Sequence, residues 1–192
     1  MKRTAQEAGL SHPEGAALQQ TEPVKRVNMP KKNAHRMHAH INPFAPLHMP
    51  TPRNPRFADW ALHYPSAYGS LDNNGNKIVV NTKQYPITYD SEPSRATKQG
   101  PVPLILDIGC GYGGLMFELT KQIDKDLILG LEIRDKVANF VGEKINTLRI
   151  NSGQKECQNV GVLRTNAMKS LHNYFQKESV SIIGGLITYF FL

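Results

Sequence analysis

Apolar runs and amphipathic segments alternate between residues 101 and 180. The run PVPLILDIG, residues 101–109, stays largely apolar until it ends in glycine, which predicts a strand buried on both faces. The next segment, residues 111–124, has apolar residues at intervals of four. This spacing predicts a short helix whose core face is formed by Leu115, Leu119 and Ile123.

The same order recurs twice more along the chain. Residues 126–133 (DLILGLEI) predict a second buried strand, and residues 159–167 (NVGVLRTNA) a third. Helices are expected over 134–153 and over 168–178. The first of them is expected to end at Gly153, and its continuous apolar face consists of Val137, Phe140, Val141, Ile145 and Leu148. A β-α-β-α-β-α order predicts an α/β fold with a parallel sheet and right-handed crossovers.

The chain before residue 101 has a different texture. Residues 1–30 are polar and aperiodic, and we expect a disordered tail. Residues 31–68 form a basic, proline-rich strap: its prolines forbid a long helix or a central strand, yet it carries aromatic side chains to bury against a domain surface, namely Phe44, Phe57, Trp60, Tyr64 and Tyr68. Residues 69–100 begin in a turn cluster and are interpreted as a surface insertion.

Positive charge is concentrated near the N-terminus. The chain has 23 Lys and Arg against 16 Asp and Glu, but residues 1–60 hold nine against four, and residues 61–192 fourteen against twelve. A cationic arm favours an anionic partner, and a solubilising tail is the alternative that charge alone leaves open.

Several classes of protein are disfavoured by composition. No run of 18 apolar residues is present, so we expect no membrane-spanning helix, and the polar N-terminus predicts no secretory signal. Two cysteines are too few for a disulfide framework or a structural zinc site, which favours a reducing, intracellular compartment. The histidines at 35, 38 and 40 lack partnering cysteines and a regular helix, so no metal site is expected.

The strongest chemical signal is a glycine-rich turn after the first predicted strand. Gly109, Gly111 and Gly114 fit G-x-G-x-x-G, a pattern that lets the backbone approach a nucleotide-like ligand. Asp107 precedes these glycines, and Glu132 ends the second strand, where a carboxylate can accept the two ribose hydroxyls of an adenosine. A turn that merely connects strand and helix is the structural alternative.

The acid in the turn discriminates between cofactors. A carboxylate beside the helix N-terminus would repel the pyrophosphate of NAD, whereas S-adenosylmethionine carries a sulfonium and an ammonium that an acid attracts. S-adenosylmethionine is therefore expected, with a nicotinamide-linked oxidoreductase as a distant alternative. After the third strand, Asn166 and the backbone at Ala167 could contact the adenine edge, and Asn166 could equally cap the following helix.

Three blocks of sequence, DIGCGYGG, LGLEIRDKV and LRTNAMKSLHNYF, resemble the tRNA (guanine-N7)-methyltransferase family in its eukaryotic form, and their spacing agrees as well. The segment PKKNAHRMHAHINP also resembles the basic N-terminal motif of that family, through Arg36, Ala39, His40, Asn42 and Pro43. The resemblance implies a doubly wound Rossmann-like sheet and methyl transfer from S-adenosylmethionine to N7 of a guanine in the variable loop of tRNA.

The resemblance also implies roles for particular residues. Asp107, Gly109, Gly111 and Gly113 would hold the methionine part of the cofactor, Glu132 the ribose, Ile133 and Arg134 the adenosine, and Asn166 with Ala167 the adenine. Phosphates of the tRNA would be contacted by the strap, with the candidates being Lys31, Lys32, Arg36 and His40. It further implies a non-catalytic WD-repeat partner, and a location in the nucleus with the cytoplasm as a second place.

The sequence departs from the family after residue 180. The family continues with a Phe-Pro-Asp-Pro-like motif that carries an acid at the guanine site, whereas this chain has an apolar tail at 181–192, which could supply one substitute strand. Residues 101–180 then amount to the N-terminal half of the sheet, and no catalytic residue can be named. We interpret the chain as a truncated form, rather than a genuine short protein, with little or no activity. A non-catalytic RNA-binding fragment is the competing function.

Overall fold

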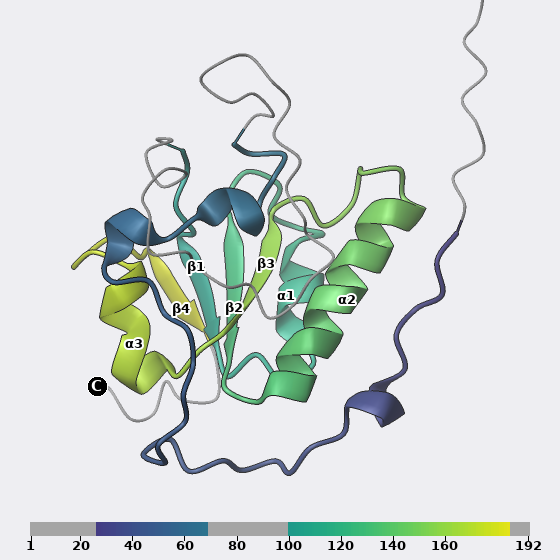
Figure 1. Ribbon diagram of the computed structural model, residues 1–192. Coiled ribbons are helices and arrows are strands. Elements are labelled where there is room, and N and C mark those ends of the chain that lie inside the picture. Colours follow the sequence, from purple (N-terminus) through teal and green to yellow (C-terminus); the bar gives the residue numbers. More distant parts are fainter. Residues whose placement is uncertain (1–25, 69–99, 185–192) are drawn as a thin grey trace, which may run out of the picture.

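A computed structural model describes residues 26–68 and 100–184, and the central element is a four-stranded parallel sheet (Figure 1). Its strands lie in the order β3-β2-β1-β4 and are β1 (Ile105–Ile108), β2 (Ile128–Glu132), β3 (Val160–Arg164) and β4 (Ile182–Gly184). The connecting helices are α1 (Gly114–Leu119), α2 (Asp135–Asn151) and α3 (Ala167–Tyr174). The predicted α/β fold with a parallel sheet is confirmed.

Alternate residues of each strand feed two separate cores, because successive side chains of a strand point to opposite faces. Ile105 of β1 and Ile128 of β2 pack with the buried faces of α1 and α2. Their neighbours Leu106 and Leu129 pack with the strap and α3 on the other face. The strap therefore completes the second covering layer, and this explains why the strands consist almost wholly of apolar residues.

Helix α2 follows the predicted pattern closely. Val137, Phe140, Val141 and Ile145 are buried against the sheet, and Leu148 is partly buried there. The chain then turns at Gly153, whose φ is +63°. A glycine in this left-handed conformation after the last turn is a frequent helix stop.

The core face predicted for the first helix is partly wrong. Met116 and Phe117 are the buried residues of α1, whereas Leu115 is 47% exposed. The helix ends at Leu119, so Ile123 packs from the following loop and not from a third turn. A spacing of four residues is ambiguous in so short a helix, because a single turn can present more than one face to the sheet.

The substitute strand expected from the apolar tail is present as β4. It pairs in parallel with β1, with Ile105 opposite Ile182 and Asp107 opposite Gly184. The edge of β1 that a three-stranded sheet would leave open is therefore covered. Among the described residues β4 and β3 are the two edge strands, and Ile182 and Ile183 of β4 are 55% and 50% exposed.

The strap wraps across the front of the sheet in Figure 1 and contains three 3-10 helices. They are η1 (Lys32–His35), η2 (Pro55–Phe57) and η3 (Trp60–Leu62). Trp60 is 5% exposed and Tyr64 is fully buried, with its hydroxyl donating to Ile128 O over 2.9 Å. Phe44 contradicts the expectation of burial, since it is 72% exposed.

Core side chains hold the backbone of the N-terminal segment at several points. Asn151 exchanges two hydrogen bonds with the backbone of Val27, at 2.8 and 2.9 Å. Lys169 donates to the carbonyls of Phe44 and Ala45, so that the ring of Phe44 can face solvent. Disorder was expected for this part of the chain, but the backbone of Val27 is held by Asn151. The local sequence could not indicate this contact, because its partner lies 124 residues away.

Predictions for residues 1–25, 69–99 and 185–192 lie outside the described residues.

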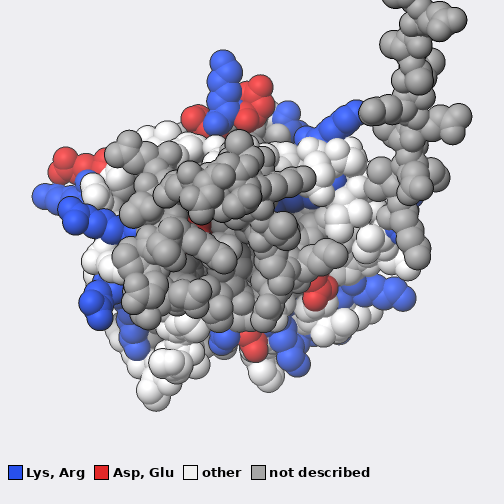
Figure 2. Space-filling view, turned by 45° about the horizontal axis from the view of Figure 1, so that its top comes forward, with Lys and Arg blue, Asp and Glu red and all other residues white. Residues whose placement is uncertain are grey.

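In Figure 2, Lys and Arg side chains lie around the rim of the molecule, interspersed with Asp and Glu. Among the described helices none is long and apolar enough to cross a membrane. Within the same residues, no group of three or more His, Cys, Asp or Glu could hold a metal ion.

Candidate functional site

The glycine turn lies where β1 ends and α1 begins, and three of its glycines have positive φ. The values are +73° at Gly109, +55° at Gly111 and +76° at Gly113, which alternate with Cys110 and Tyr112. Gly114, the third glycine of the sequence motif, is instead the first residue of α1 and has no positive φ. The backbone conformation therefore favours glycine at position 113, and not at position 114, the last glycine of the G-x-G-x-x-G motif.

This difference predicts opposite effects for two neighbouring substitutions. Gly113→Ala should lower the free energy of unfolding by about 1–2 kcal/mol, because alanine is strained at this φ and its Cβ would come close to Phe117. Gly114→Ala should leave stability unchanged or raise it by up to about 1 kcal/mol, since nothing lies within 4 Å of its Cβ in a helix. Urea unfolding of the two variants tests this, and an equal loss in both would contradict it.

Two buried carboxylates lie at the same edge of the sheet. Asp107 of β1 is 4% exposed and Glu132 of β2 is 3% exposed. Burial raises the pKa of Asp107, and the nearby charge of Glu132 raises it further. Cys110 of the turn is buried as well, and burial raises the pKa of its thiol, which argues against a nucleophilic role.

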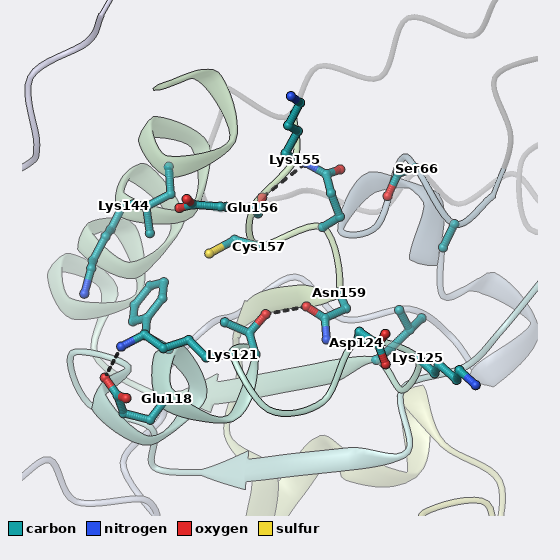
Figure 3. Close-up of a pocket in the computed structure, with 16 residues that line it drawn as sticks. Ser66, Glu118, Lys121, Asp124, Lys125, Lys144, Lys155, Glu156, Cys157 and Asn159 are labelled. Carbon is teal, nitrogen blue, oxygen red and sulfur yellow. Dashed lines mark hydrogen bonds and ion pairs between the residues drawn. The ribbon is translucent and has the colours of Figure 1, made fainter. Parts of the chain in front are cut away.

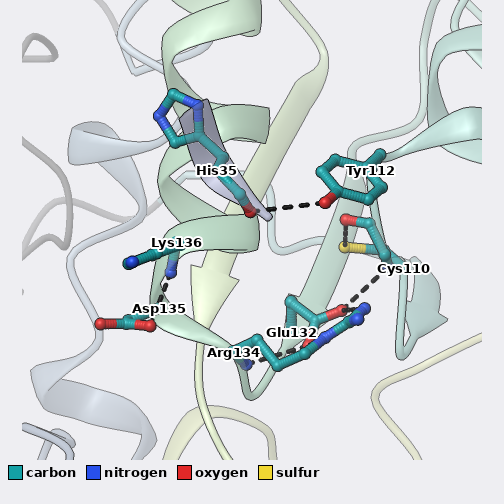
Figure 4. Close-up of polar contacts among 8 residues, drawn as sticks. His35, Cys110, Tyr112, Glu132, Arg134, Asp135 and Lys136 are labelled. Atoms are coloured by element: carbon teal, nitrogen blue, oxygen red, sulfur yellow. Dashed lines mark hydrogen bonds and ion pairs between the residues drawn. The ribbon is translucent and has the colours of Figure 1, made fainter. Parts of the chain in front are cut away.

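Glu132 is held by four hydrogen bonds (Figure 4). Its Oε2 accepts from Gly111 N at 3.0 Å and from the Arg134 guanidinium at 2.9 Å. Its Oε1 accepts from the backbone N and Nε of Arg134, at 2.9 and 3.0 Å. The carboxylate thus ties β2 to the glycine turn, and its acceptor sites are occupied by protein donors.

Asn166 combines a helix cap with a contact to the strap. Its Oδ1 accepts from Met168 N at 3.1 Å, the capping interaction expected as one alternative, and α3 begins at Ala167. Its Nδ2 donates to Pro43 O at 2.6 Å. Both polar atoms of the side chain are therefore engaged, although the residue lies at the carboxyl edge of the sheet as predicted.

A small cavity of about 160 Å³ lies at this edge, between the ends of β1, β2 and β3 and the strap. Most of its walls are apolar, which suits a flat heterocycle. Its lining residues are Ile41, Pro43, Ile108, Gly109, Leu131, Ile133, Thr165, Asn166, Ala167 and Met168. Gly109, Ile133, Asn166 and Ala167 were candidates from sequence. The contribution of Ile41 and Pro43 was missed, because nothing local in the strap signals a contact with the sheet.

The basic candidates of the strap are exposed, and one of them, Lys32, lies beside the glycine turn. Lys31, Lys32, Arg36 and His40 are all exposed. The turn reaches the strap through Tyr112, whose hydroxyl donates to His35 O at 3.4 Å and whose ring lies 5.4 Å from Lys32 Nζ. His35 packs edge-on against Phe140 of α2. One ammonium group of the strap, that of Lys32, is thereby brought next to the glycine turn.

Comparison with known proteins finds similarity to methyltransferases. Residues 101–185 match the protein family described as "Putative methyltransferase". A solved structure, geranyl diphosphate C-methyltransferase from Streptomyces coelicolor A3(2), aligns with 64% of this chain and 44% of that chain, at 18% identity and a TM-score of 0.34, which is too low to carry an argument. The parallel sheet and the glycine turn have a Rossmann-like arrangement, and the segment that matches this family contains the whole sheet.

Curated tRNA (guanine-N7)-methyltransferases are similar to this chain over most of its length. The enzyme of Eremothecium gossypii is 38% identical over 93% of this chain and 56% of the relative. That of Kluyveromyces lactis is 39% identical over 84% and 50%, and that of Arabidopsis thaliana 34% over 82% and 53%. The chain spans about half the length of these curated relatives.

Proposed function

We propose that this chain provides the cofactor half of an enzyme that transfers a methyl group from S-adenosylmethionine to N7 of a guanine in the variable loop of tRNA. The observation that carries the proposal is the joining of Glu132 to the glycine turn at the carboxyl edge of a parallel sheet. The relatives named tRNA (guanine-N(7)-)-methyltransferase support the substrate class.

The chemistry demands little acid or base from the protein. Guanine N7 has an in-plane lone pair, so it attacks the methyl carbon directly while the carbon-sulfur bond breaks to leave a neutral thioether. The positive charge moves from sulfur to the purine, and no proton is transferred. The protein has to align the two reactants and exclude water, and catalysis by orientation is well suited to a rigid glycine turn.

The residues present fit such a cofactor. The apolar cavity would take the adenine, with Ile133 and the backbone at Ala167 beside it. The buried carboxylates of Asp107 and Glu132 would attract the cationic methionine part and accept ribose hydroxyls. Because Arg134 now occupies both oxygens of Glu132, ribose binding would require this guanidinium to release at least one of them.

The strap would supply the RNA contacts through Lys31, Lys32, Arg36 and His40, all of which are exposed. Such contacts to phosphates weaken with added salt. A WD-repeat partner that helps to hold the tRNA, and a location in the nucleus with some protein in the cytoplasm, belong to the same proposal.

Titration and methyl transfer test the proposal together. Calorimetry with S-adenosylhomocysteine should show stoichiometric binding. Transfer of labelled methyl to a tRNA transcript should be compared with a transcript that carries 7-deazaguanine, which has no N7 acceptor. Cofactor binding without methylation would support a cofactor domain that needs further chain for activity. Absence of cofactor binding together with salt-sensitive RNA binding would favour the competing function, a non-catalytic RNA-binding fragment.

The raised pKa of Asp107 predicts how cofactor binding depends on pH. As pH falls through this pKa, which lies above the ordinary 3.8, Asp107 loses the charge that attracts the cationic cofactor. Binding should weaken by on the order of 1 kcal/mol. Stability should change in the opposite sense, because a carboxylate whose folded pKa is raised disfavours folding once it is charged.

The matched variant is Asp107→Asn, which keeps the shape and removes the charge. Calorimetry at a series of pH values from 7 downwards should show weaker binding for this variant, and a loss of affinity on acidification for the unaltered protein that the variant lacks. A pH profile that is the same in both proteins would contradict the role of Asp107.

A further inference from the structure

Three lysines from separate elements gather on the outer side of α1 and α2. Lys144 of α2 places its Nζ 3.7 Å from the centroid of the Phe117 ring of α1. Lys32 of η1 lies over the ring of Tyr112. Partial burial lowers the pKa of Lys144, and repulsion by Lys32 and by Lys121, which lies two residues after α1 ends, lowers it further. Three ammonium groups thus share one small region.

The acids around these lysines compensate only part of the charge. Glu118 pairs with Lys121 at 2.7 Å, and Glu143 pairs with His35 at 3.4 Å. In the part of the chain that the structure describes, no ion pair joins Lys32 or Lys144 to a carboxylate. The region therefore keeps a local excess of positive charge that an anion would relieve.

A groove continues from these lysines towards the ends at which β2 and β3 begin (Figure 3). It has a volume of about 710 Å³ and is lined by Lys121, Lys125, Lys144 and Lys155, with Glu118, Asp124 and Glu156 between them. Figure 3 shows Lys144 projecting from α2 on one side and Lys121 with Glu118 below it. The cationic region is thus continuous with a wider depression and not an isolated side-chain contact.

We propose that Lys32, Lys121 and Lys144 form a phosphate-contact subsite for structured RNA. The inference rests on the proposed function, because the ligand is the RNA substrate, and it extends the RNA-binding surface from the strap onto α1 and α2. Lys32 connects the two surfaces, since it belongs to η1 beside Lys31 and Arg36.

RNA is the occupant that the chemistry favours. Lysine ammonium groups are compact point charges that bind phosphates without reading sequence. Aromatic faces under Lys32 and Lys144 restrict these side chains in advance, so less conformational entropy is lost when a phosphate binds. A polyanion with regularly spaced charges can contact several such groups at once, whereas a single carboxylate cannot.

Salt dependence of binding to a tRNA transcript measures the number of phosphates contacted. Lys121→Met and Lys144→Met should each lower the slope of log affinity against log salt by about one, and the double variant by about two. Lys144→Arg should restore the slope. The control is Lys177→Met, which removes the same charge from a side chain that is 92% exposed and follows α3.

Amine labelling with mass spectrometry gives a second measurement on the unaltered protein. RNA should protect Lys144 at least severalfold against acetylation, and should leave Lys177 unprotected. Unchanged salt slopes, or equal labelling of Lys144 with and without RNA, would overturn the inference, as would binding of an acidic protein but not RNA. Calorimetry with S-adenosylhomocysteine should be unaffected by Lys121→Met and Lys144→Met, so a failure of the cofactor site would be recognised separately.

Discussion

Arg149→Met is expected to lower the free energy of unfolding by about 3–5 kcal/mol, because the Arg149 side chain links three parts of the fold from a buried position. The residue is 2% exposed. Its guanidinium donates to His63 O of the strap at 2.9 Å, to Val160 O of β3 at 2.8 Å, and to Cys157 O at 3.0 Å. Methionine fills a similar volume but would leave three buried carbonyls without this donor.

The measurement is urea unfolding followed by circular dichroism, with Arg56→Met as the control. Arg56 is an exposed arginine of η2, so its loss removes the same charge but should cost less than about 0.5 kcal/mol. Arg149→Lys should recover only part of the stability, since one ammonium cannot reproduce the planar geometry of a guanidinium. Equal stability of the Arg149 and Arg56 methionine variants would show that the buried network contributes little.

Glu132→Gln is expected to weaken cofactor binding by about 10- to 100-fold, which corresponds to about 1.4–2.8 kcal/mol. Glutamine keeps the shape but carries no charge, and its amide nitrogen cannot accept from Gly111 or Arg134. The ion pair between Glu132 and Arg134, at 2.9 Å and with the Glu132 side chain 3% exposed, would be lost. The glycine turn would then lose the carboxylate that fixes Gly111 N.

Calorimetry with S-adenosylhomocysteine measures this effect, and Asp135→Asn is the control. Asp135 is an acid of the same segment, at the start of α2, and it accepts a local bond from Lys136 N at 2.7 Å. Its substitution should change affinity less than about twofold, as charges that are partly open to solvent contribute little. If Glu132→Gln bound as tightly as the unaltered protein, the ribose role would be wrong, whatever the effect on stability.

The sheet and α2 could be predicted from sequence because their signals are strong and local. Three apolar runs preceded amphipathic segments, and burial on both faces leaves few polar residues in a strand. The turn at Gly109 to Gly113 was located correctly, but the need for glycine at 113 and not at 114 depends on a backbone angle. The sequence motif alone does not give the value of φ at each glycine.

Other features could not be predicted because they depend on contacts between distant parts of the chain. Nothing near Arg149 or Asn173 indicates that their donors would meet carbonyls of the strap, at His63 and Pro52. Ile41 and Pro43 likewise could not be predicted to line the cavity, because they have no sequence feature that distinguishes them from ordinary loop residues. The site residues implied by the family resemblance lie at one edge of the sheet. The side chains of Glu132 and Asn166, however, are hydrogen-bonded to other parts of the protein.

Between Pro43 and Arg53 the strap is held to α3 through its backbone carbonyls. Asn166, Lys169 and Asn173, at intervals of three and four along α3, donate to carbonyl oxygens at positions 43, 44, 45, 52 and 53. Carbonyls are present whatever the residue, and prolines can accept there although they cannot donate. The domain therefore fixes the path of this segment, while mutation can alter its outward chemistry, and with it the choice of polyanion, at small risk to folding.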